Sequence, residues 1–122
     1  MSLITKVRYH RAVATQDMPR VLERLGSTTR LREFVLQLNR AIIDIANGRG
    51  VPASPLRPPL TGWQRKRFHS RRSPAQGVNA DARLIFRIDD GGQTLYILAV
   101  GLRLPGQPDD IYALSGKRLP DD

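Results

Sequence analysis

The sequence predicts an α+β fold of the order β-α-α-β-β-β, in which a small antiparallel-rich sheet carries a helical hairpin on one face. Three observations lead to this class. Alternating polarity, which is typical of strands, occurs near the N-terminus and again after residue 62. The region between contains apolar residues at helical spacing. The length of 122 residues suits one ordinary domain, which we place at residues 1–122.

One strand and one short helix are predicted in the N-terminal quarter. Residues 3–9 alternate in polarity, as a half-buried strand does. Asp17 is expected to cap a helix over residues 18–25, because its side chain accepts hydrogen bonds from free backbone N–H groups. Pro19 falls in the first turn, where its missing N–H is not needed, and Gly26 ends the helix.

A longer amphipathic helix is predicted next, capped by Ser27 or one of the two threonines after it and closed by Asn47-Gly48. Its apolar residues recur at three- and four-residue spacing and form one wide stripe. We expect the stripe to pack on the sheet, and docking on a partner protein is the alternative. The stripe consists of Leu31, Phe34, Val35, Leu38, Ile42 and Ile45.

A basic strand is predicted over residues 63–72, after a connector at 51–59 whose prolines exclude a helix or a central strand. A row of cations on one face repels itself unless an anion lies along it. A phosphodiester backbone is the natural candidate, with Trp63 available to stack on a base. The alternative is an edge strand that its charge protects from aggregation. The face would hold Trp63, Arg65, Arg67, His69 and Arg71, and the other face Gln64, Lys66, Phe68 and Ser70.

Two hydrophobic strands joined by a tight turn are predicted over residues 82–102. The turn at 89–92 ends in two glycines, which readily take the positive φ of hairpin turns. The return strand is apolar on both faces, is therefore expected inside the sheet, and leads to Arg103. A cation there, close to Arg83 on the neighbouring strand, predicts a phosphate site. In the first strand Arg83, Ile85 and Arg87 would lie opposite Ala82, Leu84, Phe86 and Ile88.

The C-terminal segment is predicted as a loop and a short tail. Residues 104–110 contain two prolines and a glycine and lead to Tyr112. The length of this loop leaves open whether Tyr112 reaches the groove beside Arg103. The polar tail, residues 115–122, is expected to fray.

The charge balance favours a polyanionic partner. The chain has 20 Lys plus Arg against 11 Asp plus Glu, a net charge of +9. Arginine dominates, and its planar fork binds phosphate at two points. Nucleic acid or an acidic protein would suit this charge, and a merely basic solvated surface is the alternative.

Other function classes are disfavoured. The absence of cysteine excludes disulfides and thiol chemistry, and two histidines make a zinc site improbable. We expect no cofactor, because no glycine-rich phosphate loop opens a helix. No apolar run has membrane-spanning length and no signal-peptide core is present, so we expect a cytoplasmic protein without a membrane partner.

The second half of the chain resembles the RelE/ParE toxin superfamily of bacterial type II toxin–antitoxin systems. The resemblance lies in the basic strand with Arg65, Arg67 and His69, in Arg83-Leu84-Ile85-Phe86, in Val100-Gly101-Leu102-Arg103, and in Tyr112. It implies a RelE-like toxin, a metal-independent endoribonuclease that cleaves mRNA at the ribosome. The alternatives are a ParE-like toxin that binds DNA gyrase without nuclease chemistry, and a nontoxic basic RNA-binding domain on the same fold.

The resemblance also implies roles for single residues. Arg83 and Arg103 would stabilise the pentavalent phosphate, and Tyr112 would stack on a base or move a proton. His69 is a candidate general base, with a phosphate donor or a surface residue as the alternatives. The expected partners are mRNA, the ribosome and an acidic antitoxin that covers Arg83 or Arg103 or displaces a needed element. The expected RNA contacts are Trp63, Arg65, Lys66, Arg67, Arg71 and Arg87.

Overall fold

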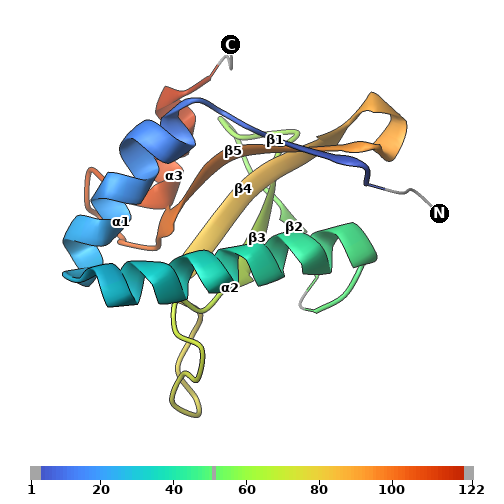
Figure 1. Cartoon of the computed structure of the whole chain (residues 1–122). Coiled ribbons are helices and arrows are strands. Elements are labelled where there is room, and N and C mark those ends of the chain that lie inside the picture. The colour runs from blue at the N-terminus through green and yellow to red at the C-terminus, as the bar shows by residue number, and fades with distance from the viewer. Residues whose placement is uncertain (1–3, 51, 120–122) are drawn as a thin grey trace.

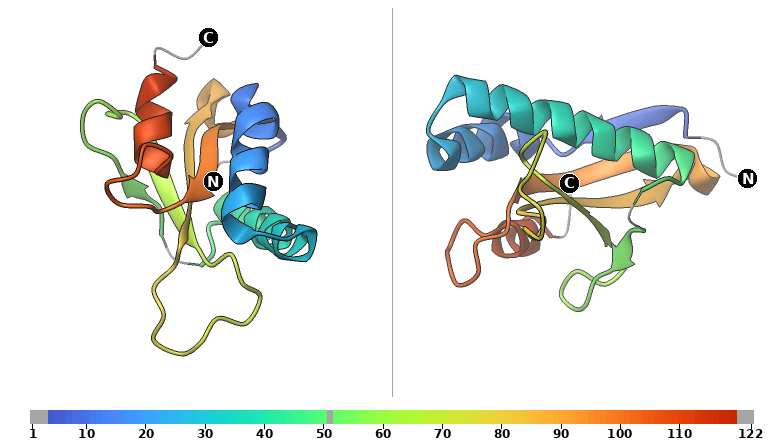
Figure 2. Two further views of the ribbon diagram at one scale, coloured as in Figure 1. Left: turned by 90° about the vertical axis from the view of Figure 1, so that its left-hand side faces the viewer. Right: turned by 90° about the horizontal axis from the view of Figure 1, so that it is seen from below.

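The computed structural model describes residues 4–50 and 52–119 and shows a mixed five-stranded sheet with helices on both faces (Figure 1). The strand order is β1-β5-β4-β3-β2, with β1 parallel to β5 and the other pairs antiparallel. Two helices cover one face and the third lies on the other (Figure 2). The elements are β1 (Lys6–Tyr9), α1 (Met18–Leu25), α2 (Thr28–Asn47), β2 (Ser54–Pro55), β3 (Gln64–Phe68), β4 (Ala82–Asp89), β5 (Thr94–Leu102) and α3 (Ile111–Lys117). The predicted fold class is confirmed.

The helical hairpin α1–α2 has the predicted bounds. Ser27 caps α2 by accepting a hydrogen bond from Arg30 N at 3.1 Å, and Gly48 ends it in the left-handed conformation with φ 64°. The role predicted for Asp17 is wrong. A π-helical turn, Val13–Asp17, runs directly into α1, so Asp17 has helical backbone angles and makes no capping hydrogen bond.

The apolar stripe of α2 packs on the sheet, as predicted. Phe34 is fully buried, and its ring centroid lies 5.4 Å from that of Phe68 on β3. Leu84 and Phe86 of β4 complete the centre of this core. Burial of such side chains is the main favourable term in folding, so α2 and the sheet stabilise each other.

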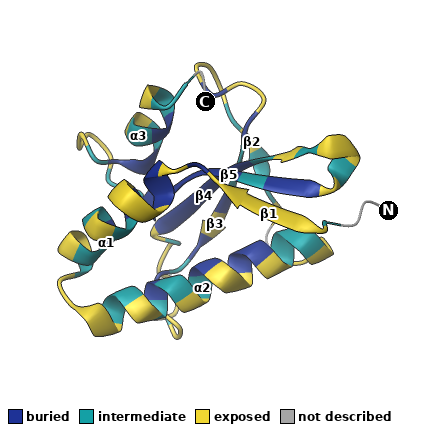
Figure 3. Cartoon of the chain, turned by 45° about the horizontal axis from the view of Figure 1, so that its top comes forward, coloured by how far each residue is buried: buried dark blue, intermediate teal, exposed yellow. Residues whose placement is uncertain are grey.

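The β4–β5 hairpin is the central part of the sheet, and both strands are buried over most of their length (Figure 3). The turn residues Asp90, Gly91 and Gly92 all have positive φ. Among residues other than glycine, Asp is one of the few types that adopt a positive φ with some frequency. The predicted turn and the position of the return strand inside the sheet are confirmed.

One residue of β5 interrupts the register with β4. Ile85 pairs with Ala99 and Phe86 with Ile97, so that Leu98 is an extra residue, a β-bulge. Before the bulge the odd-numbered residues of β5 face α2, and after it the even-numbered residues do. The residues that face α2 are Leu95, Ile97, Val100 and Leu102.

Three expectations about the remaining segments are wrong. β1 is exposed rather than half-buried, because it is the outermost strand of the sheet; residue 3 lies outside the described residues. The basic strand is shorter than residues 63–72, since β3 ends at Phe68. Residues 111–117 form α3 with Ser115 fully buried, so the predicted frayed tail is ordered here, and residues 120–122 lie outside the description.

Candidate nucleic-acid interface

The sheet face that carries α3 presents arginines from two neighbouring strands. Arg65 of β3 is paired with Ile85, and Arg83 of β4 with Gly101. Paired residues share a face. A Cβ built on Gly101 would lie 3.4 Å from Cδ1 of Ile111, the first residue of α3. The side chains of Arg65 and Arg83 therefore lie on the α3 side of the sheet.

Arg103 joins this face because the bulge reverses the alternation of β5. Its guanidinium carbon lies 4.9 Å from the ring centroid of Tyr112 on α3, a cation–π distance. Nη1 of Arg103 also donates to Oδ1 of Asp110 at 2.7 Å. Arg83 and Arg103 thus lie on one side of the sheet, as a shared phosphate site requires.

Tyr112 lies between two of the arginines. Arg65 Nη1 donates to the Tyr112 hydroxyl at 3.2 Å, while Arg103 stacks on the ring. The loop after β5 folds back to bring the tyrosine there, because Asp110 accepts hydrogen bonds from Leu104 N at 2.5 Å and from Tyr112 N at 3.3 Å. Asp110 is thereby the N-cap of α3. The question that the loop length left open is answered: Tyr112 reaches the groove.

Arg83 is held against its own strand. Its Nη1 donates to the carbonyl oxygens of Ala80 and Ala82, both at 2.9 Å, and only 9% of the residue is exposed. Within the described residues, Nε of Arg83 and Nε of Arg65 are buried without a hydrogen-bond acceptor. Buried donors are rarely left unpaired, so these two guanidinium groups keep hydrogen-bonding capacity that the described protein groups do not use.

Two predicted RNA contacts are placed elsewhere. Trp63 is on the expected face but only 5% exposed, packed in a second core with Ile85 and Leu98, so it is not available to stack on a base. Lys66 is 4% exposed on the α2 side, where its Nζ donates to Arg49 O at 3.2 Å. The alternation of β3 is as predicted; the exposure of these two side chains is wrong, because α2 and the Leu60 region cover them.

The other cations are spread around the sheet. Arg87 stacks on Trp63 at 4.7 Å and pairs with Asp89, at the hairpin end of β4. Arg67 is exposed, and it is the cross-strand partner of Arg83 in the β3–β4 pairing. His69, half-buried, and Arg71, exposed, both follow the end of β3.

Arg71 and Arg72 lie beside α2 and not beside Tyr112. Arg72 N donates to Glu33 Oε2 at 2.8 Å. This hydrogen bond, with Arg30 and Arg71 nearby, holds the pKa of Glu33 below its usual value. Arg71 is therefore separated from Arg65 and Arg103, the two arginines that contact Tyr112.

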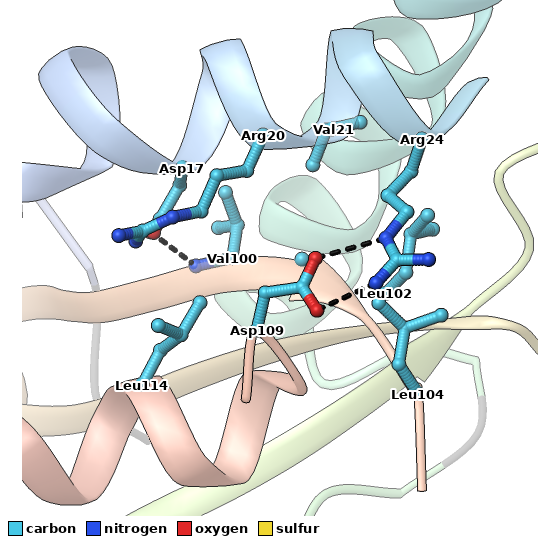
Figure 4. A pocket seen from close by; sticks show the side chains of 10 residues that line it. Asp17, Arg20, Val21, Arg24, Val100, Leu102, Leu104, Asp109 and Leu114 are labelled. Atoms are coloured by element: carbon cyan, nitrogen blue, oxygen red, sulfur yellow. Dashed lines mark hydrogen bonds and ion pairs between the residues drawn. The ribbon is translucent and has the colours of Figure 1, made fainter. Parts of the chain in front are cut away.

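Two ion pairs that the sequence did not reveal link the α3 region to α1 and to the turn before it, and Figure 4 shows the first of them, Arg24 with Asp109. Arg24 of α1 contacts Asp109 with two hydrogen bonds, of 2.9 and 2.7 Å, which lower the pKa of Asp109. Asp17 is fully buried, accepts from Val100 N at 3.0 Å and pairs with Arg118 at 2.5 Å. Both pairs hold the loop and helix that carry Tyr112.

A cavity of roughly 470 Å³ opens beside Tyr112. Its walls come from the connector between β2 and β3 and from Arg65. The prolines of this connector were the available sequence signal, and they indicated a stiff segment but not what it faces. Among residues 4–50 and 52–119 no cluster of His, Cys, Asp or Glu could hold a metal ion. Within the same residues, no helix is both long and apolar enough to cross a membrane.

Solved structures with this fold include bacterial toxins. A chain of the toxin–antitoxin complex RelBE2 from Mycobacterium tuberculosis is 25% identical, with a TM-score of 0.52 and coverage of 83% of this chain and 100% of that chain. A double arginine-to-alanine mutant of E. coli toxin RelE in the free state is 12% identical, with a TM-score of 0.52 and coverage of 98% and 99%. The likeness to the E. coli protein concerns the fold alone.

No family model and no curated protein sequence matches the chain. The fold is nevertheless shared over nearly the whole chain, and the strands carry the arginine motifs in the expected order. The likeness to the RelBE2 chain supports the RelE-like toxin superfamily for this chain.

Proposed function

We propose that the chain is the toxin of a type II toxin–antitoxin system and a metal-independent endoribonuclease that cleaves mRNA at the ribosome. The observation that carries the proposal is Tyr112, which accepts a hydrogen bond from Arg65 and stacks under Arg103, on the face that also holds Arg83. A tyrosine that contacts two arginines, with a third arginine on the same face of the sheet, can bind a phosphate and move a proton beside it.

The chemical step of the proposed reaction uses only groups of the RNA and side chains of this chain. The 2′-oxygen of a nucleotide attacks the adjacent phosphorus, the bond to the 5′-oxygen breaks, and the products are a 2′,3′-cyclic phosphate and a 5′-hydroxyl. Charge grows on the phosphate oxygens in the transition state, where preorganised donors from Arg83 and Arg103 stabilise it. Losing one such donor typically costs about 2.7 to 4 kcal/mol of barrier.

Two protons move in this reaction. The hydroxyl oxygen of Tyr112 already accepts from Arg65, so its own proton is directed to another acceptor, and we assign it to the departing 5′-oxygen. His69 is the proposed acceptor of the 2′-hydroxyl proton. The exposed Arg67, with Arg71 and Arg87 further along the chain, is proposed to contact the RNA backbone outside the reacting centre.

The proposed inhibitor is an acidic antitoxin that covers Arg103 and Tyr112. The net charge of +9 favours such a partner, and the similar RelBE2 chain was solved in a toxin–antitoxin complex. An antitoxin complex that leaves Arg83, Arg103 and Tyr112 open to solvent would count against this part of the proposal.

The test is expression in cells, with mapping of mRNA 5′ ends and a parallel translation reaction with and without ribosomes. Wild type should produce ribosome-dependent cuts. Tyr112→Phe keeps the ring but removes the proton, and Arg103→Lys keeps a charge for Asp110 but removes the planar fork. Each should slow cleavage by about 10²-fold or more. Arg32→Ala, an exposed α2 arginine, is the matched control and should cleave normally.

Two results would overturn the nuclease assignment. Growth arrest with intact mRNA and gyrase-linked DNA damage would indicate the ParE-like activity. Absence of arrest, with retained RNA binding, would indicate a nontoxic RNA-binding domain. Thermal unfolding of each variant separates a lost activity from a lost fold.

A further inference from the structure

We propose that the cavity beside Tyr112 binds one nucleobase of the RNA, next to the phosphate that is cleaved, and so sets a base preference. This inference rests on the proposed function, because it places the base beside the reacting centre. The cavity is lined by Pro55, Leu56, Arg57, Pro58, Pro59, Leu60, Arg65 and Tyr112.

The wall of the cavity is a preformed turn. Leu56 N donates to Trp63 O at 3.0 Å, Leu60 N to Arg57 O at 2.9 Å, and Trp63 N to Leu60 O at 3.1 Å. Leu60 and Trp63 are both 5% exposed and anchor the turn in the second core. Pro55, Pro58 and Pro59 fix φ at three further positions, so little order has to be gained there when a ligand binds.

The turn and α3 lie on the same side of the sheet, opposite α2 (Figure 2, right). Tyr112 and Arg65 belong both to the cavity and to the arginine cluster, since the Arg65 guanidinium contacts the tyrosine hydroxyl. A phosphate held at Arg103 and Tyr112 would therefore have its neighbouring base within reach of the proline turn.

The chemistry of the lining fits a base with its sugar-phosphate. Proline and leucine side chains offer apolar surface to a flat ring, and the exposed Arg57 and the half-buried Arg65 offer planar donors to its edge or to a phosphate. Among the residues that the structure describes, no acidic side chain lines the cavity. Its volume, roughly 470 Å³, lies in the usual range for small-ligand pockets, about 300–1,000 Å³.

The first experiment tests binding without cleavage. The full chain is titrated with the four homopolymeric 2′-O-methyl trinucleotides, which lack the attacking hydroxyl, and the backbone amides are followed by NMR. The amides of Leu56, Arg57 and Leu60 should shift, and the affinities should differ by about fivefold or more between bases. Arg57→Ala should reduce that difference, whereas Arg32→Ala on α2 should not.

The second experiment maps cut sites in cells for wild type and Arg57→Ala. The base frequencies next to the cut should change in Arg57→Ala, whereas Tyr112→Phe should lower all cuts alike. If wild type cleaves but Arg57→Ala keeps the same base frequencies, and the turn amides do not move, the base pocket is wrong and the nuclease stands.

If wild type does not cleave, the proposed function fails while the trinucleotide titration still decides the pocket. Shifts of the turn amides with an acidic peptide, and none with any trinucleotide, would assign the cavity to a protein partner and overturn the inference.

Discussion

On the face of the sheet that carries α2, strands β3, β4 and β5 present Phe68, Leu84 and Val100 to a helix of 20 residues. On the opposite face the same strands, or the residue that follows them, present arginines to a helix of 7 residues and a proline turn. A lysine on the first face, Lys66, is buried against a backbone carbonyl. The arginines on the second face keep unpaired buried donors.

The comparison teaches that the element packed on a face, more than composition, decides which cations are paired within the protein and which keep donors for a ligand. A long helix leaves no room for a ligand, so the polar groups beneath it must be paired within the protein. A short helix and a turn leave a groove.

Loss of the Asp17 carboxylate should have the largest effect. Asp17→Ala leaves Arg118 buried without its partner and removes the acceptor for Val100 N. Breaking one side of a buried pair typically costs about 3–5 kcal/mol. Urea denaturation should show this loss of stability.

The matched control is Arg24→Ala, which breaks the exposed pair with Asp109 and should change stability far less. Equal effects of Asp17→Ala and Arg24→Ala would mean that burial does not distinguish the two links between α1 and the α3 region.

Neighbouring positions of β3 allow the two faces to be compared directly. Arg65→Met removes a charged hydrogen bond to Tyr112, of a kind worth about 1.5–3 kcal/mol, and should slow RNA cleavage by about tenfold or more. Lys66→Met keeps an apolar chain under α2 and should leave the cleavage rate unchanged. Cleavage assays on purified variants with ribosomes measure both.

A loss of cleavage in Lys66→Met, at unchanged thermal stability, would contradict the assignment of that lysine to the fold. Unchanged cleavage in Arg65→Met would remove Arg65 from the reacting centre.

Acid should weaken both sides of the molecule modestly. The pKa values of Glu33, beside α2, and of Asp109, before α3, are lowered in the folded protein by hydrogen bonds from Arg72 and Arg24. The unfolded chain therefore binds more protons, so this stabilisation is present above the ordinary carboxyl pKa and is lost as the pH falls through the folded pKa.

Melting temperatures between neutral pH and the acid range should show this loss, and Glu33→Gln or Asp109→Asn should each flatten the acid slope. A slope that neither substitution changes would assign acid sensitivity to other carboxylates. A slope that only one of the two substitutions changes would show whether the acid-sensitive contact is the one beside α2 or the one before α3.

Local patterns predicted most of the fold. The stripe of α2, its Ser27 cap and the glycines of the hairpin turn are signals within a few residues of each other, so they could be interpreted without knowing the neighbours. α3 was missed because its N-cap, Asp110, follows Pro108 and Asp109 and resembles loop sequence, and because its seven residues are too few for a clear period. What holds it is distant in sequence: Arg118 pairs with Asp17.

The sequence predicted which residue types form the candidate site, but not how their side chains are placed and buried. Alternation grouped Trp63 with Arg65 in one strand and Arg83 with Ile85 in another, but it is the pairing of β3 with β4 that brings both groups to one face. Packing then decides that Trp63 and Arg83 are buried while Arg65 is half-buried. The face of Arg103 could not be predicted, because β5 is apolar on both sides and its alternation carries no signal. The cavity beside Tyr112 needs the β2–β3 connector and α3 together, and these are far apart along the chain.

The bulge at Leu98 determines which face of the sheet Arg103 joins. If every residue of β5 paired with β4 without a bulge, continuous alternation from Leu95 and Ile97 would turn Arg103 toward α2 and Leu102 toward Tyr112. Deletion of Leu98 would instead make Ile97 and Ala99 neighbours in a regular ladder with Phe86 and Ile85, and Arg103 would still face Tyr112. Among related chains, those with one residue fewer at this point should therefore keep the paired arginine face without needing a bulge.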